Sequence, residues 1–116
     1  MGRWRYGRSH SYRHDALRPL VKAAFKQLRA GRGLITRMGF MCCMSCACAA
    51  LDEMLEKRPK IRGAVYFHRQ DDESFRDGYD LHLRYAPRGD DPDNDVWKAL
   101  GYEVVEALRE IGRAHV

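Results

Sequence analysis

The sequence has 116 residues, of which 45% are hydrophobic, and a formal net charge of +5. This length and composition predict one folded domain with one core, and they exclude a disordered chain and a two-domain protein. The longest uncharged run, residues 38–51, is shorter than the roughly 20 apolar residues that span a bilayer. The first residues also lack the apolar run of a signal peptide. We therefore expect a cytoplasmic protein without a membrane partner, whose four cysteines are reduced thiols or metal ligands.

The positive charge is concentrated at the N-terminus. Residues 1–14 hold four arginines and no acid, whereas the other 17 basic residues nearly balance the 16 acidic ones. In residues 1–14 the arginines alternate with aromatic residues, without the period of a helix or a strand. Arginine beside aromatic rings is typical of nucleic-acid binding, and it also suits an arm that packs on a protein. We predict a basic aromatic arm at 1–14 and a single α+β domain at 15–116.

Three segments have the apolar spacing of amphipathic helices. The first covers residues 15–30 and ends before two glycines. The second begins at about Cys43 or Ser45 and ends at Arg58, just before a proline. The third begins after an aspartate cap at position 93 or 95 and ends at residue 111.

Alternating polar and apolar residues predict strands over 34–41, 61–70 and 79–86. The polar run 71–78 is predicted as a loop, and a loop of this length should join the last two strands in antiparallel pairing. The element order is then α-β-α-β-β-α. It predicts a small, mainly antiparallel sheet of three to four strands, with three helices mostly on one face.

All four cysteines lie between residues 42 and 48, in a run without charged residues. If the segment is helical from Cys42 onward, Cys42 and Cys46 share one side, because residues four apart lie on the same helix face. Cys48 falls on the apolar stripe and is predicted as a small buried side chain. At most three thiols therefore converge, namely those of Cys42, Cys43 and Cys46.

Three interpretations of the cysteines remain open. The spacing Cys43-x-x-Cys46 is typical of zinc ligands, and His68 is a candidate fourth ligand. A strand followed by CxxC and a helix also fits thiol redox chemistry, because a helix N-terminus lowers a thiol pKa. Finally, cysteine, alanine and serine are small enough to let a helix lie close to a sheet, and we favour this packing role. The expected cofactor is none, or one zinc ion.

Several blocks of the sequence resemble an uncharacterised family of small bacterial and bacteriophage proteins, known only as a domain of unknown function. The resemblance covers about residues 15–116 and implies no known activity. The chain departs from the family pattern after the third cysteine, where it has Ala47-Cys48. The resemblance suggests a shared site of Cys42, Cys43, Cys46, His68, Gln70 and Asp71. The blocks that carry it are Phe40-x-Cys42-Cys43-x-x-Cys46, Val65-Tyr66-Phe67-His68-x-Gln70-Asp71, Gly78-Tyr79-Asp80-Leu81-x-Leu83 and Val104-Val105-x-Ala107-Leu108-Arg109-Glu110-x-Gly112.

We expect a non-enzymatic protein, either a monomer or a homodimer, that acts by binding a host protein, with inhibition of that protein as one form of this action. A phage or mobile-element origin is consistent with the resemblance. A zinc-binding module and a thiol redox protein are the alternatives. The zinc alternative uses Cys42, Cys43, Cys46 and His68. The predicted partner surface combines Arg3, Trp4, Arg5, Tyr6 and Arg8 of the arm with the acids Asp71, Asp72, Glu73 and Asp77.

Overall fold

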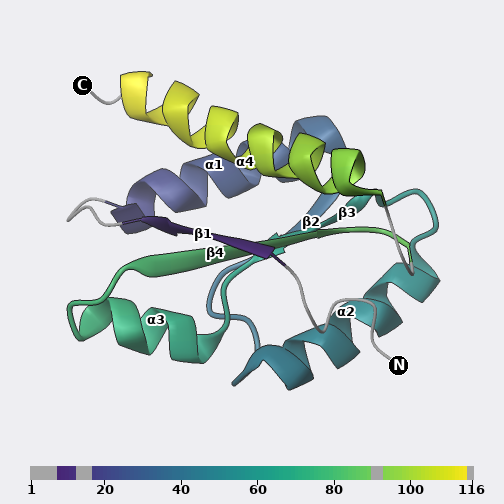
Figure 1. The fold of residues 1–116 in the computed structure, drawn as a ribbon, viewed down its shortest axis with the longest axis horizontal. Coiled ribbons are helices and arrows are strands. Elements are labelled where there is room, and N and C mark those ends of the chain that lie inside the picture. The colour runs from purple at the N-terminus through teal and green to yellow at the C-terminus, as the bar shows by residue number, and fades with distance from the viewer. Residues whose placement is uncertain (1–7, 13–16, 90–92, 115–116) are drawn as a thin grey trace.

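The computed structural model describes residues 8–12, 17–89 and 93–114, and it contains four helices and four strands in these ranges (Figure 1). Among the described residues, no helix is both long and apolar enough to cross a membrane. The elements in chain order are β1 (Arg8–Tyr12), α1 (Leu17–Arg32), β2 (Leu34–Arg37), α2 (Met44–Lys57), β3 (Gly63–Tyr66), α3 (Arg69–Arg76), β4 (Leu81–Pro87) and α4 (Asn94–Ala114).

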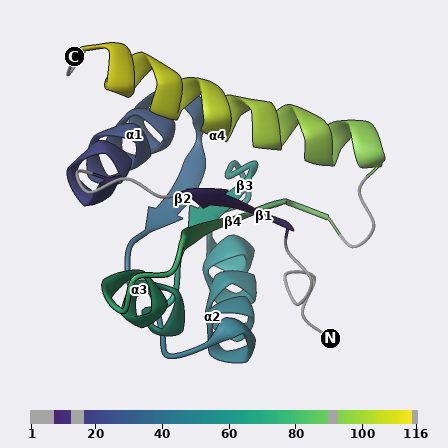
Figure 2. The ribbon, with the colours of Figure 1, turned by 60° about the vertical axis from the view of Figure 1, so that its left-hand side comes forward.

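The strands form one mixed sheet in the order β1-β4-β3-β2. Strands β2 and β3 run parallel, with Leu34 opposite Gly63. Strand β4 is antiparallel to both of its neighbours, β3 and β1. Helices α1 and α4 cover one face of the sheet, and α2 and α3 cover the other (Figure 2). The domain therefore has three layers, with the sheet in the middle.

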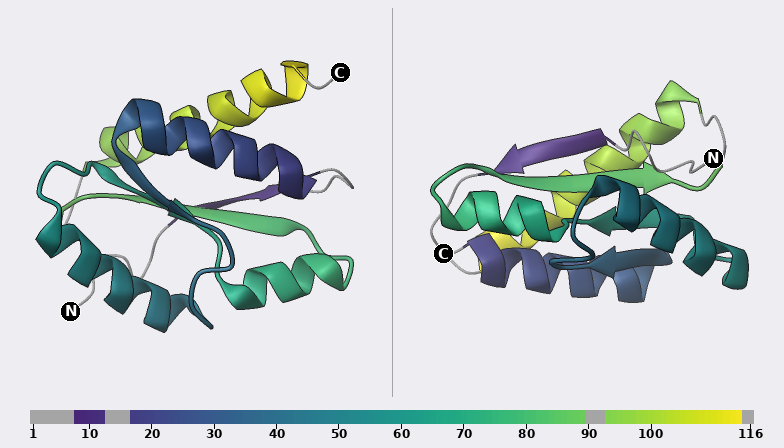
Figure 3. Two further views of the ribbon diagram at one scale, coloured as in Figure 1. Left: turned by 180° about the vertical axis from the view of Figure 1, so that it is seen from behind. Right: turned by 90° about the horizontal axis from the view of Figure 1, so that it is seen from below.

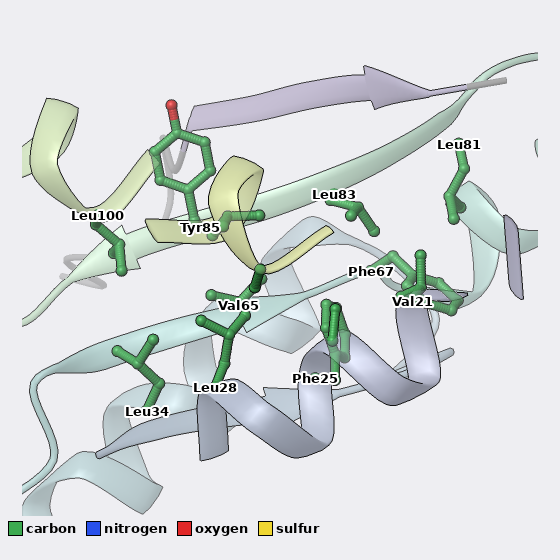
Figure 4. Close-up of a cluster of buried hydrophobic side chains, with 13 residues drawn as sticks. Val21, Phe25, Leu28, Leu34, Val65, Phe67, Leu81, Leu83, Tyr85 and Leu100 are labelled. Atoms are coloured by element: carbon green, nitrogen blue, oxygen red, sulfur yellow. The ribbon is translucent and has the colours of Figure 1, made fainter. Parts of the chain in front are cut away.

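Each face of the sheet has its own hydrophobic core. Between the sheet and helices α1 and α4, the rings of Phe25 and Phe67 lie 6.3 Å apart, and Val21 and Leu28 point toward the strands (Figure 4). On the opposite face, α2 packs small and aliphatic side chains against the sheet. Because β3 is an inner strand covered on both faces, all four of its residues are buried. The second core consists of Ile35, Ala47, Cys48, Leu51, Leu55, Ala64, Tyr66 and Ala86.

The prediction of an α+β domain with a small sheet is confirmed, but its finer arrangement is partly wrong. The helices lie on both faces, not mostly on one. The sheet is mixed, because the α2 crossover returns the chain to the end of the sheet where β2 begins and so sets β3 parallel to β2. The strand pair β3–β4 is antiparallel as predicted. A strand also occurs at Arg8–Tyr12, inside the segment predicted as an arm.

The predicted polar loop at 71–78 is wrong, because residues 69–76 form the helix α3. This helix has almost no apolar stripe, so the periodicity of its sequence does not show it. Its beginning is fixed by a capping box, in which His68 accepts from the backbone N–H of Asp71 and the Asp71 carboxylate accepts from the backbone N–H of His68. The order of helices and strands is therefore longer by one strand and one helix than predicted.

Candidate metal centre

The cysteine cluster lies where the two parallel strands end. Strand β2 leads into α2 and strand β3 leads into α3, so both helices begin at the same end of the sheet (Figure 3). Two backbone hydrogen bonds join the connecting segments. Phe40 N–H donates to the carbonyl of Phe67 at 2.8 Å, and Arg69 N–H donates to the carbonyl of Met41 at 2.9 Å. Ligand sites commonly occur at the carboxyl ends of parallel strands.

The backbone before the cysteines has an unusual conformation. Gly39 and Met41 have positive φ angles of 59° and 61°. A side chain at such an angle is strained, and outliers of this kind cluster at functional sites. Met41 is also 40% exposed, although it is a large apolar residue. The two left-handed residues turn the chain between β2 and α2, and the thiols follow directly.

Three thiols converge at this turn. The sulfur of Cys42 lies 3.7 Å from the sulfur of Cys43 and 3.4 Å from that of Cys46. All three sulfur atoms lie within 4.8 Å of one another. With zinc–sulfur bonds of about 2.3 Å, two ligands of a tetrahedral ion lie about 3.8 Å apart. The two short separations are close to this value, so the three sulfurs have nearly the size of one face of a zinc tetrahedron.

The start of α2 makes the thiols chemically unequal. Cys43 is the N-cap residue, and its side chain makes no capping hydrogen bond. The pKa of Cys43 is nevertheless lowered, mainly by the backbone N–H of Cys46 and to a smaller extent by the thiols of Cys42 and Cys46. Hydrogen bonds with Cys42 and Cys43 raise the pKa of Cys46 to about 11. The thiolate is therefore favoured at Cys43, whereas a metal must displace the proton of Cys46.

The fourth cysteine has a different environment. Cys48 is 3% exposed and packs between α2 and the sheet, as predicted from its place on the apolar stripe. It lies beside Tyr66. The pKa of the Tyr66 phenol is raised mainly by burial and, to a smaller extent, by the nearby Cys48. The Tyr66 hydroxyl is 3.2 Å from the sulfur of Met44, in the first turn of α2. These contacts fix the beginning of α2 against β3.

His68, the predicted fourth ligand, is not in the thiol group that the structure brings together. It is 4% exposed and is occupied as the N-cap of α3, since its Nδ1 accepts from the backbone N–H of Asp71 at 3.2 Å. Asp71 is also buried, and it accepts two hydrogen bonds of 2.8 Å from Arg84. Gln70 is exposed in the first turn of α3. The His68–Asp71–Arg84 group therefore stabilises the neighbouring helix.

Sequence reasoning missed Arg84 as the partner of Asp71. Arg84 alternates with apolar residues along β4, as a residue on a solvated strand face does. The signal in the sequence was the three-residue spacing from His68 to Asp71, which is that of a capping box although neither residue is the usual one, and it marks the start of a helix at residue 69.

The predicted partner surface is only partly accessible. Asp72 is buried at 8% exposure and forms ion pairs with Arg18 and Arg76. Asp71 is likewise buried, so two of the four predicted acids are used inside the domain. Glu73 and Asp77 are exposed. Arg8 of the predicted arm lies in β1, whose side chains the structure does not describe. The other predicted arm residues, Arg3, Trp4, Arg5 and Tyr6, lie outside the described residues.

The buried imidazole predicts a dependence of stability on pH. Burial has the largest effect and lowers the pKa of His68, and the Arg84 cation acts in the same direction against the opposing effect of Asp71. The folded protein therefore takes up this proton less readily than the unfolded chain. The stabilisation of the fold by neutral His68 is complete above the ordinary histidine pKa near 6.5, and it is lost as the pH falls below that value.

We expect the free energy of unfolding, measured in urea, to fall between pH 7 and pH 5. His68→Asn keeps a good N-cap residue but removes the titrating ring, so its stability should change less over this interval. His82→Asn, on a half-buried histidine of β4, is the matched control and should retain the full slope. A slope that is the same in His68→Asn and in the unchanged protein contradicts the prediction.

The comparisons with known proteins identify a family. A family model described as a domain of unknown function, DUF6891, matches residues 10–114. The chain therefore belongs to this family, as the resemblance predicted, and the match begins within β1 instead of after the predicted arm. Neither the curated proteins nor the solved structures gave a match.

Proposed function

We propose that this domain is a zinc-binding module that holds one ion through the thiolates of Cys42, Cys43 and Cys46. The observation that carries the proposal is the convergence of three sulfur atoms within 4.8 Å at one turn. Thiolates favour zinc and other soft ions over hard ions such as magnesium. Three thiolates leave the fourth tetrahedral position to water or to a ligand from outside the cluster.

The site has the properties of an accessible centre and not of a structural one. Its ligands come from five consecutive residues, so an ion there cross-links no distant parts of the chain. Cys42 is exposed, and Cys43 and Cys46 are partly exposed. The two hydrophobic cores, by contrast, hold the layers together without any of the three thiols. The module is therefore suited to take up and release zinc, or to present it to a ligand from a partner, without unfolding.

The packing role that the sequence favoured for the cysteines accounts for Cys48 but not for the other three, since none of these belongs to either hydrophobic core. Thiol redox chemistry is a weaker alternative. The lowered pKa of Cys43 favours it, but the CxxC motif follows an edge strand of the sheet. Binding to a host protein stays a prediction.

Cobalt titration tests the proposal, because Co²⁺ replaces zinc and gives intense thiolate charge-transfer and visible absorption in tetrahedral sites. We expect one Co²⁺ per reduced chain, and we expect stoichiometric zinc to displace it. The single variants Cys42→Ser, Cys43→Ser and Cys46→Ser should each weaken binding at least tenfold. Cys48→Ala, which removes the buried thiol, is the matched control and should bind like the unchanged protein.

Removal of zinc by a chelator should leave the far-UV circular dichroism spectrum intact, because the cores form independently of the ion. Three results would contradict the proposal: no charge-transfer band, equal effects of the Cys48 and Cys43 replacements, or unfolding on chelation. The last result would make the centre structural. Rapid alkylation of one thiol by iodoacetamide below pH 7, with no metal bound, would favour the redox alternative.

A further inference from the structure

A second candidate site lies between helix α1 and the end of strand β2. It is a groove of about 550 Å³, which is within the range of about 300–1,000 Å³ that is typical of small-molecule sites. Its described lining includes four cations, Lys22, Lys26, Arg29 and Arg37, and no acid. The accessible apolar part of the lining includes Ala23 and Met38. The groove thus combines concentrated positive charge with an apolar floor.

The cations of the groove have no acidic partners within the described part of the chain. Lys22, Lys26 and Arg29 follow one another at intervals of four and three residues and share one face of α1. Among the described residues, the Arg37 side chain donates to the backbone carbonyl of Thr36 alone, at 2.8 Å. Burial, followed by the nearby cations Arg58 and Arg29, lowers the pKa of Arg37. Elsewhere on this helix the charge is compensated, since Arg32 pairs with Glu103 at 3.1 Å.

The floor of the groove limits the class of anion. Phe25 is 4% exposed, so no aromatic face is presented for stacking of nucleic-acid bases. An inorganic anion alone would leave the apolar floor in contact with water. A small molecule with both a multiply charged group and an apolar body satisfies both parts of the lining, because like charges need a counter-charge and apolar surface favours burial.

We infer that this groove binds a small organic phosphate with an apolar body, and that Lys26, Arg29 and Arg37 hold its phosphate. The inference is independent of the metal centre, since none of its lining residues is a thiol. The side chains of Lys22 and Lys26 are exposed, so they can be replaced without opening a core.

The test uses 1-naphthyl phosphate as a fluorescent probe, with inorganic phosphate and 1-naphthol as the two half-ligands. We expect one molecule of 1-naphthyl phosphate per chain, bound at least tenfold more tightly than either half-ligand. Lys26→Gln should weaken binding about tenfold. Lys98→Gln removes the same charge from an exposed position on α4 and should change the dissociation constant less than twofold.

A second variant separates binding from folding. Ala23→Glu places a carboxylate in the groove on a half-buried helical position, among cations that favour it. It should abolish probe binding while the thermal midpoint stays the same or rises. Cys43→Ser should bind the probe normally, which distinguishes this site from the metal centre.

Equal affinity for 1-naphthyl phosphate and inorganic phosphate would overturn the inference, as would equal losses in Lys26→Gln and Lys98→Gln. Binding of an acidic peptide in the groove without binding of the probe would replace the small molecule by a protein partner and would also overturn it.

Discussion

Replacement of Asp71 by alanine is expected to lower the free energy of unfolding by about 3–5 kcal/mol, as is typical when one partner of a buried ion pair is removed. The Asp71 side chain is 5% exposed, and that of its partner Arg84 is 22% exposed. Both oxygens of the carboxylate accept from Arg84 at 2.8 Å, and one of them also accepts from the backbone N–H of His68 at 3.3 Å. Alanine therefore leaves a half-buried guanidinium without a counter-charge and removes half of the capping box of α3.

Urea unfolding at pH 7 measures this change. Glu73→Ala, on an exposed acid two residues further along α3, is the matched control and should change stability by less than about 0.5 kcal/mol. The double replacement Asp71→Leu with Arg84→Met should recover part of the loss, because two apolar residues of similar size need no charge pairing. A loss below 1 kcal/mol in Asp71→Ala would show that Arg84 finds water or another acid.

The same reasoning predicts a smaller role for the neighbouring acid. Asp72 is also buried, but the side chains of its partners Arg18 and Arg76 are 41% and 67% exposed. Exposed cations are screened by water, so pairs of this kind contribute about 1 kcal/mol or less. The first turn of α3 therefore contains one acid that the fold needs and one that it tolerates.

The three helices predicted from the sequence are the ones with strong apolar periodicity. Helices α1, α2 and α4 each bury a stripe, and that stripe is visible in the order of residues. Their ends differ from prediction by a few residues, as at α4, which ends at Ala114 instead of residue 111. Hydrophobic periodicity thus identified the elements that build the two cores.

Elements stabilised by polar contacts could not be found in this way. Helix α3 depends on a capping box and on Arg84, a residue 13 positions beyond Asp71. Strand β1 exists through pairing with β4, a partner more than 60 residues away. The parallel pairing of β2 with β3 also follows from the three-dimensional path of the crossover. The strand pairings depend on contacts between residues that are distant in the sequence, and α3 depends on one such contact, with Arg84, beside its local capping box.

The candidate metal centre was predicted more completely than the groove. The sequence predicted convergence of the same three thiols from a helix beginning at Cys42. In the structure α2 begins at Met44 and Cys43 is extended, so the turn at Met41, and not a shared helix face, brings the three sulfurs together. His68 was added because histidines are common zinc ligands, but its position directly before α3 makes it a cap. The groove was not predicted from the sequence. Its cations come from one face of α1 and from the end of β2, and the sequence of each segment alone is that of an ordinary solvent-exposed surface.

Replacement of Gly63 by alanine is expected to destabilise the domain by about 3 kcal/mol, at the upper end of typical costs for overpacking. Gly63 begins the inner strand β3 and lies opposite Pro87 of β4. A Cβ atom at this position would lie 2.6 Å from the carbonyl oxygen of Ala86 and 3.0 Å from the Cα of Pro87. Both atoms belong to the backbone, so the strands themselves must separate.

Gly31→Ala provides the matched control, because it makes the same chemical change in the last turn of α1. A Cβ at Gly31 meets no atom within 4 Å and the residue has no positive φ, so alanine should stabilise the domain by about 0.5–1 kcal/mol. Urea unfolding of the two variants should therefore give changes of opposite sign. A neutral Gly63→Ala would mean that β4 can shift away from β3 at low cost. Since β3 also leads to α3, such freedom would imply that the junction beside the cysteines is less rigid than a preformed three-thiol site requires.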